Sequence, residues 1–168
     1  MNLGHRISRP RCIFVFLAIC LLTSLARADW PAFRHDAERT GYTPEALPAK
    51  LSVQWVHHAA KPQPAWPRSS RMMFDFAHQP IAVGDMIWFG SSVDGAVHAL
   101  EARSGKRKWL FYTQSPIRFA PVFWEGNLFV GSDDGCLYCL EAASGKLLWK
   151  LRAGPSDEMV LGNGRMVS

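Results

Sequence analysis

The chain has 168 residues, of which 48% are hydrophobic, 20% charged and 12% aromatic, a composition that indicates a folded, β-rich domain and excludes a disordered chain. Its formal charge of +5 comes largely from residues 1–28, which hold four arginines and no acidic residue; the remaining 15 basic and 14 acidic residues leave a net charge of +1. The dense basic run beyond them, residues 106–108, lies beside a turn and is a poor footprint for nucleic acid, so we expect no nucleic-acid partner.

Residues 1–28 have the organisation of a secretory signal peptide. A basic start precedes an apolar run at residues 13–22, and an Ala-Arg-Ala cleavage site ends at Ala28. The apolar run is shorter than a bilayer span requires, with an uncleaved anchor as the alternative, and the bulky Ile19 before Cys20 argues against lipid attachment. We expect a signal peptide cleaved after Ala28, a periplasmic or secreted mature chain, and no stable membrane insertion after cleavage.

A leading segment follows at residues 29–56. It ends in KLSVQWV at residues 50–56, which has the pattern of a β-strand. Its Trp55 lies where a tryptophan recurs in the repeats described below, so we interpret residues 50–56 as the fourth strand of a preceding sheet or as a closing strand. Four polar residues nearer the start are interpreted as anchors of this segment and not as a site: Arg34, His35, Asp36 and Arg39.

Residues 57–78 form a proline-rich loop with three prolines and three aromatic residues. Irregular connections of this length are uncommon in compact domains and tend to be functional or disordered. Three interpretations stay open: a metal site, a partner- or ligand-facing loop, or a passive covering loop. The metal interpretation rests on His57, His58, Asp75 and His78.

Two similar segments come next, one at residues 79–118 and one at residues 119–154. The stretch PIAVGDMIWFGSSVDGAVHALEARSGKRKW in the first aligns with PVFWEGNLFVGSDDGCLYCLEAASGKLLW in the second. The offset is 41 residues at the first matched glycine and 40 from the Asp-Gly turn onward. Such self-similarity is the signature of a repeat architecture. The matched positions, which we expect to be structural, are Gly90, Asp94, Gly95, Gly105, Trp109, Gly131, Asp134, Gly135, Gly145 and Trp149.

Turn signals divide each copy into four short strands. In the second copy they fall at about residues 120–124, 127–131, 136–141 and 146–151, separated by Glu-Gly, Asp-Asp-Gly and Ala-Ser-Gly turns. Four antiparallel strands joined by tight turns form one meandering sheet, which cannot bury both of its faces alone. Copies must stack, and radial stacking of such sheets produces a propeller. The predicted fold class is all-β, with four-stranded β-propeller blades of about 40 residues: blade 1 at residues 79–118 and blade 2 at residues 119–154.

Residues 155–168 look like the start of a third blade. Two blades do not close a ring, which usually has at least four, and open sheet edges are a liability that folded proteins normally cover. We therefore expect an incomplete ring, as an N-terminal fragment of a longer propeller in preference to a piece that partner chains complete. The expected partner is another protein or further propeller blades.

The end of each copy resembles a known motif. ALEARSGKRKW at residues 99–109 and CLEAASGKLLW at residues 139–149 are similar to the tryptophan-docking motif of pyrroloquinoline-quinone (PQQ) repeat β-propellers, Ala-x-Asp-x-x-Thr-Gly-x-x-x-Trp. Glu replaces the Asp, Ser replaces the Thr, and Cys139 replaces the Ala of the second copy. DWPAFR at residues 29–34 also resembles the leading segment of such exported propellers. The resemblance implies that each tryptophan stacks on the neighbouring blade; the Gly-His and Trp-Asp signatures of WD-repeat propellers are absent.

The resemblance implies two opposed functions. PQQ-dependent dehydrogenases need the quinone, a calcium ion, an aspartate base and, in many, a disulfide between adjacent cysteines; this chain has no adjacent cysteine pair, and its cofactor-binding residues are unassigned. Other family members are non-catalytic, among them a scaffold of outer-membrane assembly that binds no PQQ. We favour a non-catalytic protein-interaction scaffold without a catalytic residue, metal or cofactor. The alternatives are a fragment of a PQQ-dependent dehydrogenase, whose longer parent would bind PQQ with calcium, and a carbohydrate- or ligand-binding propeller.

Cys136 and Cys139 form a Cys-x-x-Cys pair inside a predicted strand. Residues three apart in a strand point to opposite faces, which argues against a thioredoxin-type redox site. No further ligands are spaced for zinc, and no histidine follows Cys139 for haem attachment. We expect one buried and one outward-facing cysteine.

Overall fold

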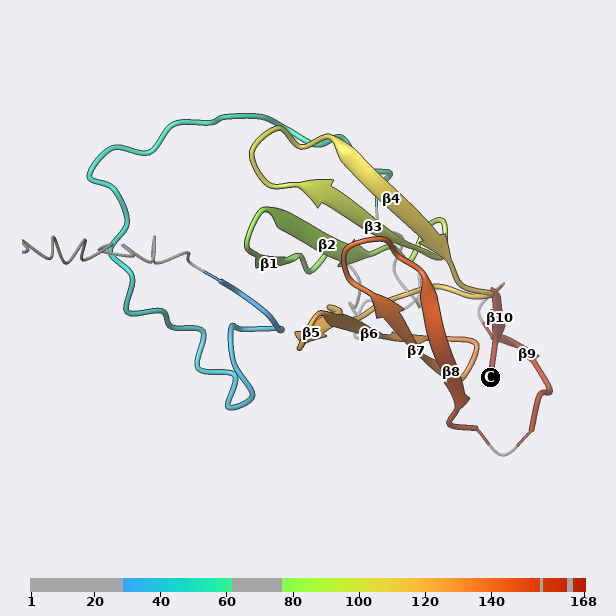
Figure 1. Ribbon diagram of the computed structural model, residues 1–168. Coiled ribbons are helices and arrows are strands. Elements are labelled where there is room, and N and C mark those ends of the chain that lie inside the picture. The colour runs from blue at the N-terminus through green and yellow to red at the C-terminus, as the bar shows by residue number, and fades with distance from the viewer. Residues whose placement is uncertain (1–28, 62–76, 155, 163–164) are drawn as a thin grey trace, which may run out of the picture.

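The computed structural model describes residues 29–61, 77–154, 156–162 and 165–168. In these residues the chain forms two four-stranded antiparallel sheets and one two-stranded hairpin (Figure 1). No helix occurs among them, and thus none long and apolar enough to cross a membrane. The predicted all-β fold is confirmed, whereas the predicted signal peptide and most of the proline-rich loop lie outside the described residues.

Blade 1 is a meander in which each strand pairs with the next along the chain. Its strands are β1 (Ile81–Val83), β2 (Met86–Gly90), β3 (Ala96–Glu101) and β4 (Arg107–Tyr112). Side chains alternate between the two faces of a strand, so Val97 and Ala99 lie on one face of β3 while His98 and Leu100 lie on the other. Most of β3 is buried on both faces, as expected for a sheet stacked inside a propeller.

Blade 2 repeats this arrangement with β5 (Val122–Trp124), β6 (Asn127–Ser132), β7 (Cys136–Glu141) and β8 (Leu147–Arg152). These strands lie where the turn signals predict them, with ends that differ by two residues or fewer. Even a register shift is repeated, between Ala99 and Leu100 in blade 1 and between Cys139 and Leu140 in blade 2. The pairing of the two outermost strands is therefore interrupted at the same place in each blade, next to the repeated tryptophan.

The last described strands, β9 (Val160–Gly162) and β10 (Arg165–Val167), form a hairpin in the residues expected to open a third blade. Hydrogen bonds attach this hairpin and the adjacent Ser168 to blade 2 and to the connection between the blades, among them a 2.6 Å bond from the guanidinium of Arg152 to the hydroxyl of Ser168. The amide of Ser168 donates to the carbonyl of Asp133 at 2.8 Å, and the hydroxyl of Ser115 donates to the carbonyl of Met166 at 2.7 Å.

The leading segment connects the inner strands of the two blades. Trp30 forms an antiparallel bridge with Ala82 of β1, and the carbonyl of Pro31 accepts a hydrogen bond of 2.8 Å from the amide of Phe123 in β5. The segment then turns sharply, and Asp36 accepts a 2.8 Å hydrogen bond from the amide of Thr40. These bonds place residues 29–31 across the inner edges of both sheets.

Residues 50–56 form no strand, so the strand prediction for them is wrong. A strand needs a neighbour whose amides and carbonyls complete its hydrogen bonds, and residues 50–56 pair with no strand of the described sheets. Leu51, Val53 and Val56 are exposed, whereas Trp55 is half-buried against blade 1. The side chain of Trp55 therefore attaches residues 50–56 to blade 1, in place of the backbone hydrogen bonds expected for a strand.

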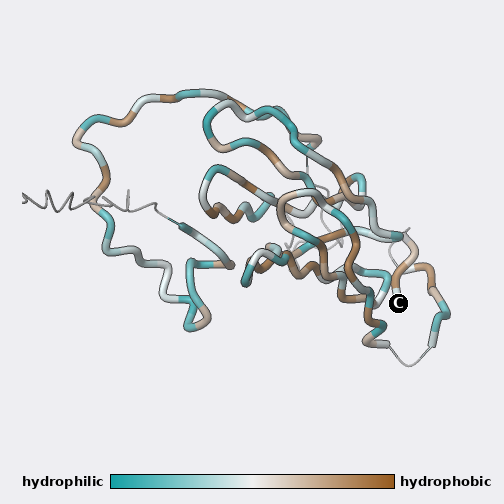
Figure 2. The backbone as a smooth tube through the Cα atoms, in the orientation of Figure 1, coloured by the Kyte–Doolittle hydropathy of each residue, from teal (hydrophilic) through white to brown (hydrophobic). Residues whose placement is uncertain are grey.

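The core lies between the two blades, and hydrophobic residues concentrate in their strands (Figure 2). We call the blade face that looks toward the preceding part of the chain its upstream face and the opposite one its downstream face. The downstream face of blade 1 packs on the upstream face of blade 2. The downstream face of blade 1 consists of Trp88, Val97, Ala99, Trp109 and Phe111. The upstream face of blade 2 consists of Leu128, Val130, Cys136, Tyr138 and Leu140.

Candidate functional site

The contact between the blades centres on Trp109 of β4. Its indole nitrogen donates a 3.1 Å hydrogen bond to the carbonyl of Ala142, in the turn after β7, and Trp88 donates to the same carbonyl at 3.2 Å. The indole ring of Trp109 lies flat against Gly145, where an added Cβ would come within 2.6 Å of the ring. Burying such a ring contributes about 2–3 kcal/mol. We call the Ala142 carbonyl and Gly145 the acceptor turn of blade 2.

Blade 1 has the same acceptor turn, made by the Ala102 carbonyl and Gly105, and Trp55 occupies it. The indole nitrogen of Trp55 donates to Ala102 at 2.9 Å. A Cβ at Gly105 would meet the three nearest ring atoms at 2.6, 2.7 and 3.1 Å, the same distances found for Trp109 at Gly145. Trp55 thus makes the tryptophan contact although its segment is not part of a sheet.

Trp149, the third tryptophan of the series, has no acceptor turn among the described residues and is 44% exposed. It belongs to the downstream face of blade 2, whose residues occupy the positions of the covered downstream face of blade 1. Leu151, for example, is 57% exposed, while the corresponding Phe111 packs against the core. This face consists of Phe129, Leu137, Cys139, Trp149 and Leu151. An apolar face of this kind marks an interaction surface, and it is the candidate site.

The expectation of one buried and one outward-facing cysteine is wrong in part, because both cysteines are buried. They do point to opposite faces of β7. Cys136 belongs to the core between the blades, whereas Cys139 faces downstream, beneath its cross-strand neighbours Phe129 and Trp149. Those two large rings, 5.9 Å apart, cover the small thiol. Burial raises the pKa of Cys139, which makes it a poor nucleophile.

On the other side of the molecule, a cavity of about 540 Å³ separates the leading segment from the upstream face of blade 1. Trp30, Trp55, His57, His78, Ile81 and Phe89 are among its lining residues. The corresponding upstream face of blade 2 is filled by the side chains of blade 1. The cavity corresponds in position to the space on blade 2 that blade 1 fills, and among the described residues Trp55 and its neighbours border it.

Three imidazole rings surround Phe89 at this cavity. Ring-centroid distances from Phe89 are 4.7 Å to His98, 5.1 Å to His78 and 5.6 Å to His57. Burial lowers the pKa of His57, and the nearby charges of His98, His58 and His78 lower it further. The described residues contain no group of three or more potential ligands placed to hold a metal ion, and Asp75 lies outside them.

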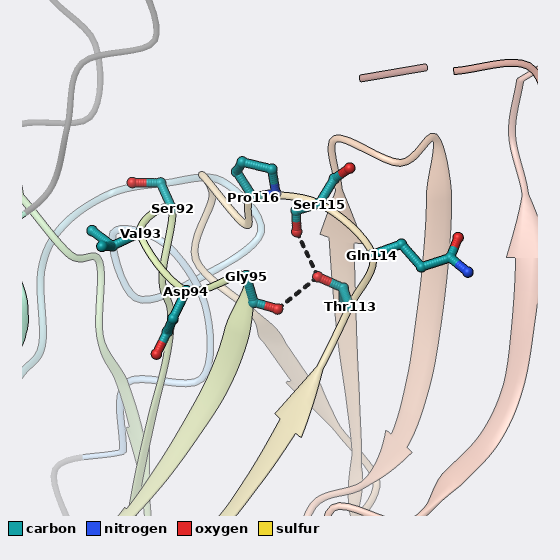
Figure 3. A pocket seen from close by; sticks show the side chains of 8 residues that line it. All are labelled: Ser92, Val93, Asp94, Gly95, Thr113, Gln114, Ser115 and Pro116. Carbon is teal, nitrogen blue, oxygen red and sulfur yellow. Dashed lines mark hydrogen bonds between the residues drawn. The ribbon is translucent and has the colours of Figure 1, made fainter. Parts of the chain in front are cut away.

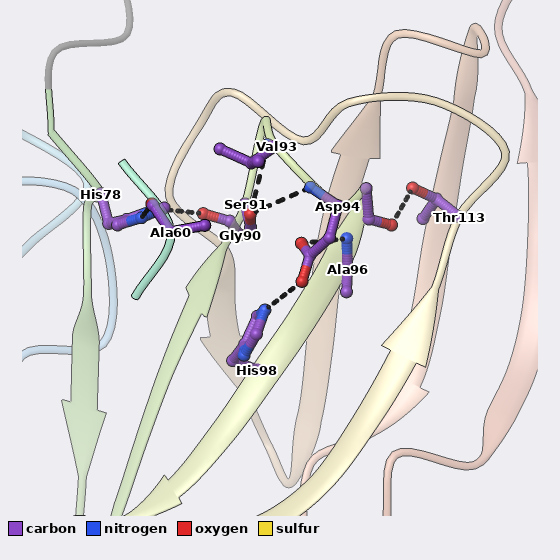
Figure 4. A network of polar contacts seen from close by, with 10 residues as sticks. Ala60, His78, Gly90, Ser91, Val93, Asp94, Ala96, His98 and Thr113 are labelled. Carbon is purple, nitrogen blue, oxygen red and sulfur yellow. Dashed lines mark hydrogen bonds and ion pairs between the residues drawn. The ribbon is translucent and has the colours of Figure 1, made fainter. Parts of the chain in front are cut away.

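The first repeat aspartate joins this cluster to a turn (Figure 4). One oxygen of Asp94 lies 3.0 Å from Nε2 of His98, and the other accepts a 3.3 Å hydrogen bond from the amide of Ala96. Beside this turn is a small polar cavity of about 280 Å³, lined by residues 92–95 and 113–116 (Figure 3). The hydroxyl of Thr113 contacts the carbonyls of Gly95 and Ser115 there, at 2.8 and 2.7 Å.

The second repeat aspartate, Asp134, is fully buried. One oxygen accepts from the amide of Cys136 at 3.0 Å; the other accepts from the amide of Gln114 at 3.2 Å and from the hydroxyl of Tyr138. Burial, together with the bond to Asp134, raises the pKa of Tyr138 to about 12. Both oxygens of each repeat aspartate thus contact groups of this chain.

The repeat glycines lie in turns and at close contacts. Gly95 and Gly135 have φ of +65° and +75° in the Asp-Gly turns. A Cβ at Gly90 would come within 2.2 Å of Ile117, whereas Gly131 has nothing within 4 Å. His98 was not singled out from the sequence, although the repeat alignment places it at the position of Tyr138 and so predicts a polar ring on an upstream face. The contribution of the Ala102 and Ala142 carbonyls has no sequence signal, because every residue has a carbonyl.

Comparison with known proteins gives the following similarities. Residues 93–167 match the model of a family described as outer membrane protein assembly factor BamB, and no curated protein matches the chain. The quinohemoprotein alcohol dehydrogenase from Comamonas testosteroni is similar over 74% of this chain and 19% of its own, with a TM-score of 0.53 and 22% identity; this likeness shows the fold alone.

Two further solved structures are similar over shorter stretches. BamB from Moraxella catarrhalis matches 45% of this chain and 26% of its own, with a TM-score of 0.39 and 19% identity. The quinohemoprotein alcohol dehydrogenase ADHIIG from Pseudomonas putida HK5 matches 46% of this chain and 13% of its own, with a TM-score of 0.43 and 24% identity. The chain therefore spans about a quarter or less of the length of these solved relatives.

Proposed function

We propose that the chain is an exported, non-catalytic scaffold of the PQQ-repeat β-propeller family whose downstream face on blade 2 binds a polypeptide. One observation carries the proposal. The downstream faces of the two blades have matching residues, yet that of blade 1 is covered by another sheet while Trp149 and Leu151 of blade 2 are exposed. The interface between the blades supports the idea that such a face binds a sheet.

The energetics favour occupancy of this face. Burying the exposed part of an aromatic or aliphatic side chain contributes about 25 cal/mol for each Å² removed from water. The ring of Trp149 has a donor nitrogen that would also gain an acceptor, as that of Trp109 does at Ala142. Large apolar faces with a tryptophan at their centre are typical binding surfaces.

The proposal includes no cofactor. The two repeat aspartates support this part of it, since Asp134 is buried with donors on both oxygens and Asp94 is occupied by His98 and an amide. A PQQ-dependent dehydrogenase is the competing function, and it makes a distinct prediction. Reconstitution of the chain with PQQ and calcium, followed by dye-linked oxidation of simple alcohols, would then give turnover, which the scaffold proposal does not allow.

The direct test is site-specific photo-crosslinking in cells that export the chain. A photo-crosslinking amino acid at Leu151, in the downstream face, is expected to give an adduct with a polypeptide that mass spectrometry identifies. The matched control is Glu125, which is exposed in the turn between β5 and β6, and it is expected to give none. Absence of an adduct at Leu151, or equal adducts at both positions, would contradict the proposal.

A further inference from the structure

The last strand of each blade is an edge strand. Among the described residues, β4 pairs with β3 alone and β8 pairs with β7 alone (Figure 1). An edge strand presents backbone N–H and C=O groups without a partner strand, and another extended chain can pair with them. Because β8 repeats β4 at an offset of 40 residues, the side chains at matched positions show which of the two edges favours such pairing.

A following blade leaves an edge of this kind exposed. Blade 2 packs on the downstream face of blade 1, yet Arg107 and Lys108 of β4 remain exposed. Stacked sheets meet through their faces, and radial repetition keeps a short edge on every blade. The availability of the β8 edge therefore does not depend on what covers the downstream face of blade 2.

The edge of β4 resists pairing. Its first two residues, Arg107 and Lys108, are cationic, and Nζ of Lys108 lies 3.2 Å from a carboxylate oxygen of Glu101. An added strand would remove these charges from water, so charged side chains on an edge strand oppose pairing. After one further residue, the two cations are followed by Leu110.

The edge of β8 has the reverse pattern. Leu147 and Leu148 replace the two cations and are 42% and 47% exposed, and Lys150 replaces Leu110. The ammonium of Lys150 lies 5.1 Å from the centroid of the Tyr138 ring and forms no ion pair with a described residue. The β8 edge therefore presents two aliphatic side chains and, two positions further on, a cation that a carboxylate can neutralise.

We propose that the outer edge of β8 binds an extended segment of another polypeptide by strand addition, with aliphatic residues against Leu147 and Leu148 and a carboxylate against Lys150. Charge complementarity at Lys150 and the burial of the two leucines specify this occupant. All described strand pairs are antiparallel, so the segment runs antiparallel to β8 and reads Glu-x-Val-Val or a similar sequence. This edge is distinct from the downstream face, so the inference goes beyond the proposed function.

The experiment titrates the chain with the acetylated and amidated peptide Thr-Thr-Glu-Thr-Val-Val-Thr-Thr and measures binding by calorimetry. The wild-type chain is expected to bind a single peptide with a Kd below about 1 mM. The same peptide with every backbone amide methylated is expected not to bind, because it keeps the side chains but lacks backbone donors. Hydrogen exchange in the complex with the parent peptide should show new protection in β8.

Two variants exchange the leucines and the cations between the edges. Leu147→Arg/Leu148→Lys gives β8 the residues that β4 carries, and it is expected to lower the affinity by about tenfold or more. Arg107→Leu/Lys108→Leu is the matched reverse exchange, and it is expected to add a second, weaker site on β4. This reverse exchange keeps the test decisive if the first variant does not fold.

The role of Lys150 is tested by a double-mutant cycle. Glu→Gln in the peptide is expected to weaken binding to the wild type by up to roughly fivefold and to leave binding to Lys150→Leu unchanged. The inference is overturned if the wild type does not bind, if the methylated peptide binds equally well, or if both exchanges leave the binding unchanged. Any of these results together with a crosslink at Leu151 would overturn strand addition and leave the proposed scaffold function intact.

Discussion

At the residue scale, Gly145 combines two features of which Gly126, another turn glycine, has only one. Its φ of +74° lies in the left-handed region, and the ring of Trp109 occupies the space where a Cβ would be. Gly126 has a similar φ of +79° but nothing within 4 Å of its added Cβ. Comparing substitutions at Gly145 and Gly126 therefore separates the effect of backbone strain from the effect of the nearby indole ring.

We predict that Gly145→Ala destabilises the chain more than Gly126→Ala does. Both variants carry the left-handed strain, about 1–2 kcal/mol. Only Gly145→Ala adds overpacking against Trp109, about 1–3 kcal/mol. Urea unfolding at low protein concentration measures both. Equal losses of unfolding free energy would mean that the contact between Trp109 and Gly145 does not restrict this position.

Tyr138 predicts a loss of stability at alkaline pH. Its pKa is raised to about 12 in the folded chain from the ordinary value of 10, so the folded state holds the phenol proton more tightly than the unfolded state does. The resulting stabilisation is fully present below pH 10 and is lost as the pH rises toward 12. We expect the free energy of unfolding to fall over that range in the wild-type chain.

Tyr138→Phe should remove this part of the pH dependence, at the cost of the hydrogen bond to Asp134, about 1.5–3 kcal/mol at neutral pH. The matched control is Tyr112→Phe, since Tyr112 is exposed on β4. Urea unfolding between pH 9 and pH 12 gives the slopes for all three proteins. Wild-type and Tyr138→Phe slopes that coincide would contradict the prediction.

At the scale of the elements, the strands of the blades follow from local signals in the sequence, because turn glycines and alternating side chains are local. The strand predicted at residues 50–56 did not form because a strand depends on a neighbour, which the pattern KLSVQWV does not specify. Cys139 is buried for a similar reason. The alternation of side chains along β7 predicts correctly that Cys139 points away from Cys136. The residues that bury it, Phe129 and Trp149, lie on other strands and have no signal in the sequence of β7.

The candidate site, too, could be predicted from the sequence only in part. Trp109 and Trp149 could be recognised from the repeat, and Trp55 could be recognised as their equivalent from its sequence context. That Trp55 occupies an acceptor turn, while Trp149 does not, depends on which sheets lie next to each other in space. One histidine beside Phe89 comes from β3, and the other two, His57 and His78, are the two ends of residues 57–78, so no local pattern joins them.

His57 makes the attachment of the leading segment sensitive to acid. The groups that face it are Phe89 of β2, His98 of β3, which contacts Asp94, and His78 and His58. Its pKa is lowered from the ordinary 6.5, so the folded state disfavours the charged ring. The attachment is therefore fully stabilised above pH 6.5, and that stabilisation is lost as the pH falls below it.

We predict that acidification from pH 7.5 to pH 5 weakens the contact of Trp55 with Ala102. The measurement is the indole N–H signal of Trp55 in nitrogen-edited NMR spectra, assigned by Trp55→Phe. His57→Gln should weaken the pH dependence, and the signal of Trp109, bound to Ala142, should not follow it. A Trp55 signal that titrates identically in the wild type and in His57→Gln would rule out His57 as the responsive group.

At the scale of the whole molecule, stability in a repeat array is approximately a sum of terms for each repeat and for each interface between neighbours. Here the interface between the blades holds most of the buried core, including Trp88, Val97 and Leu140. Neither sheet covers its own apolar faces. The two blades should therefore unfold as one cooperative unit, and damage to their interface should be felt in both sheets.

Trp109→Ala tests this coupling, with Trp149→Ala as its matched control. Trp109 is partly buried, so its loss should cost about 2–3 kcal/mol, somewhat below the 3–5 kcal/mol of a fully buried ring. Hydrogen exchange at low protein concentration should show protection falling in β3 and β7 alike. Trp149→Ala should leave both strands protected, because no sheet among the described residues covers Trp149. A loss confined to blade 1 after Trp109→Ala would mean that the blades fold independently and that their interface contributes little to either.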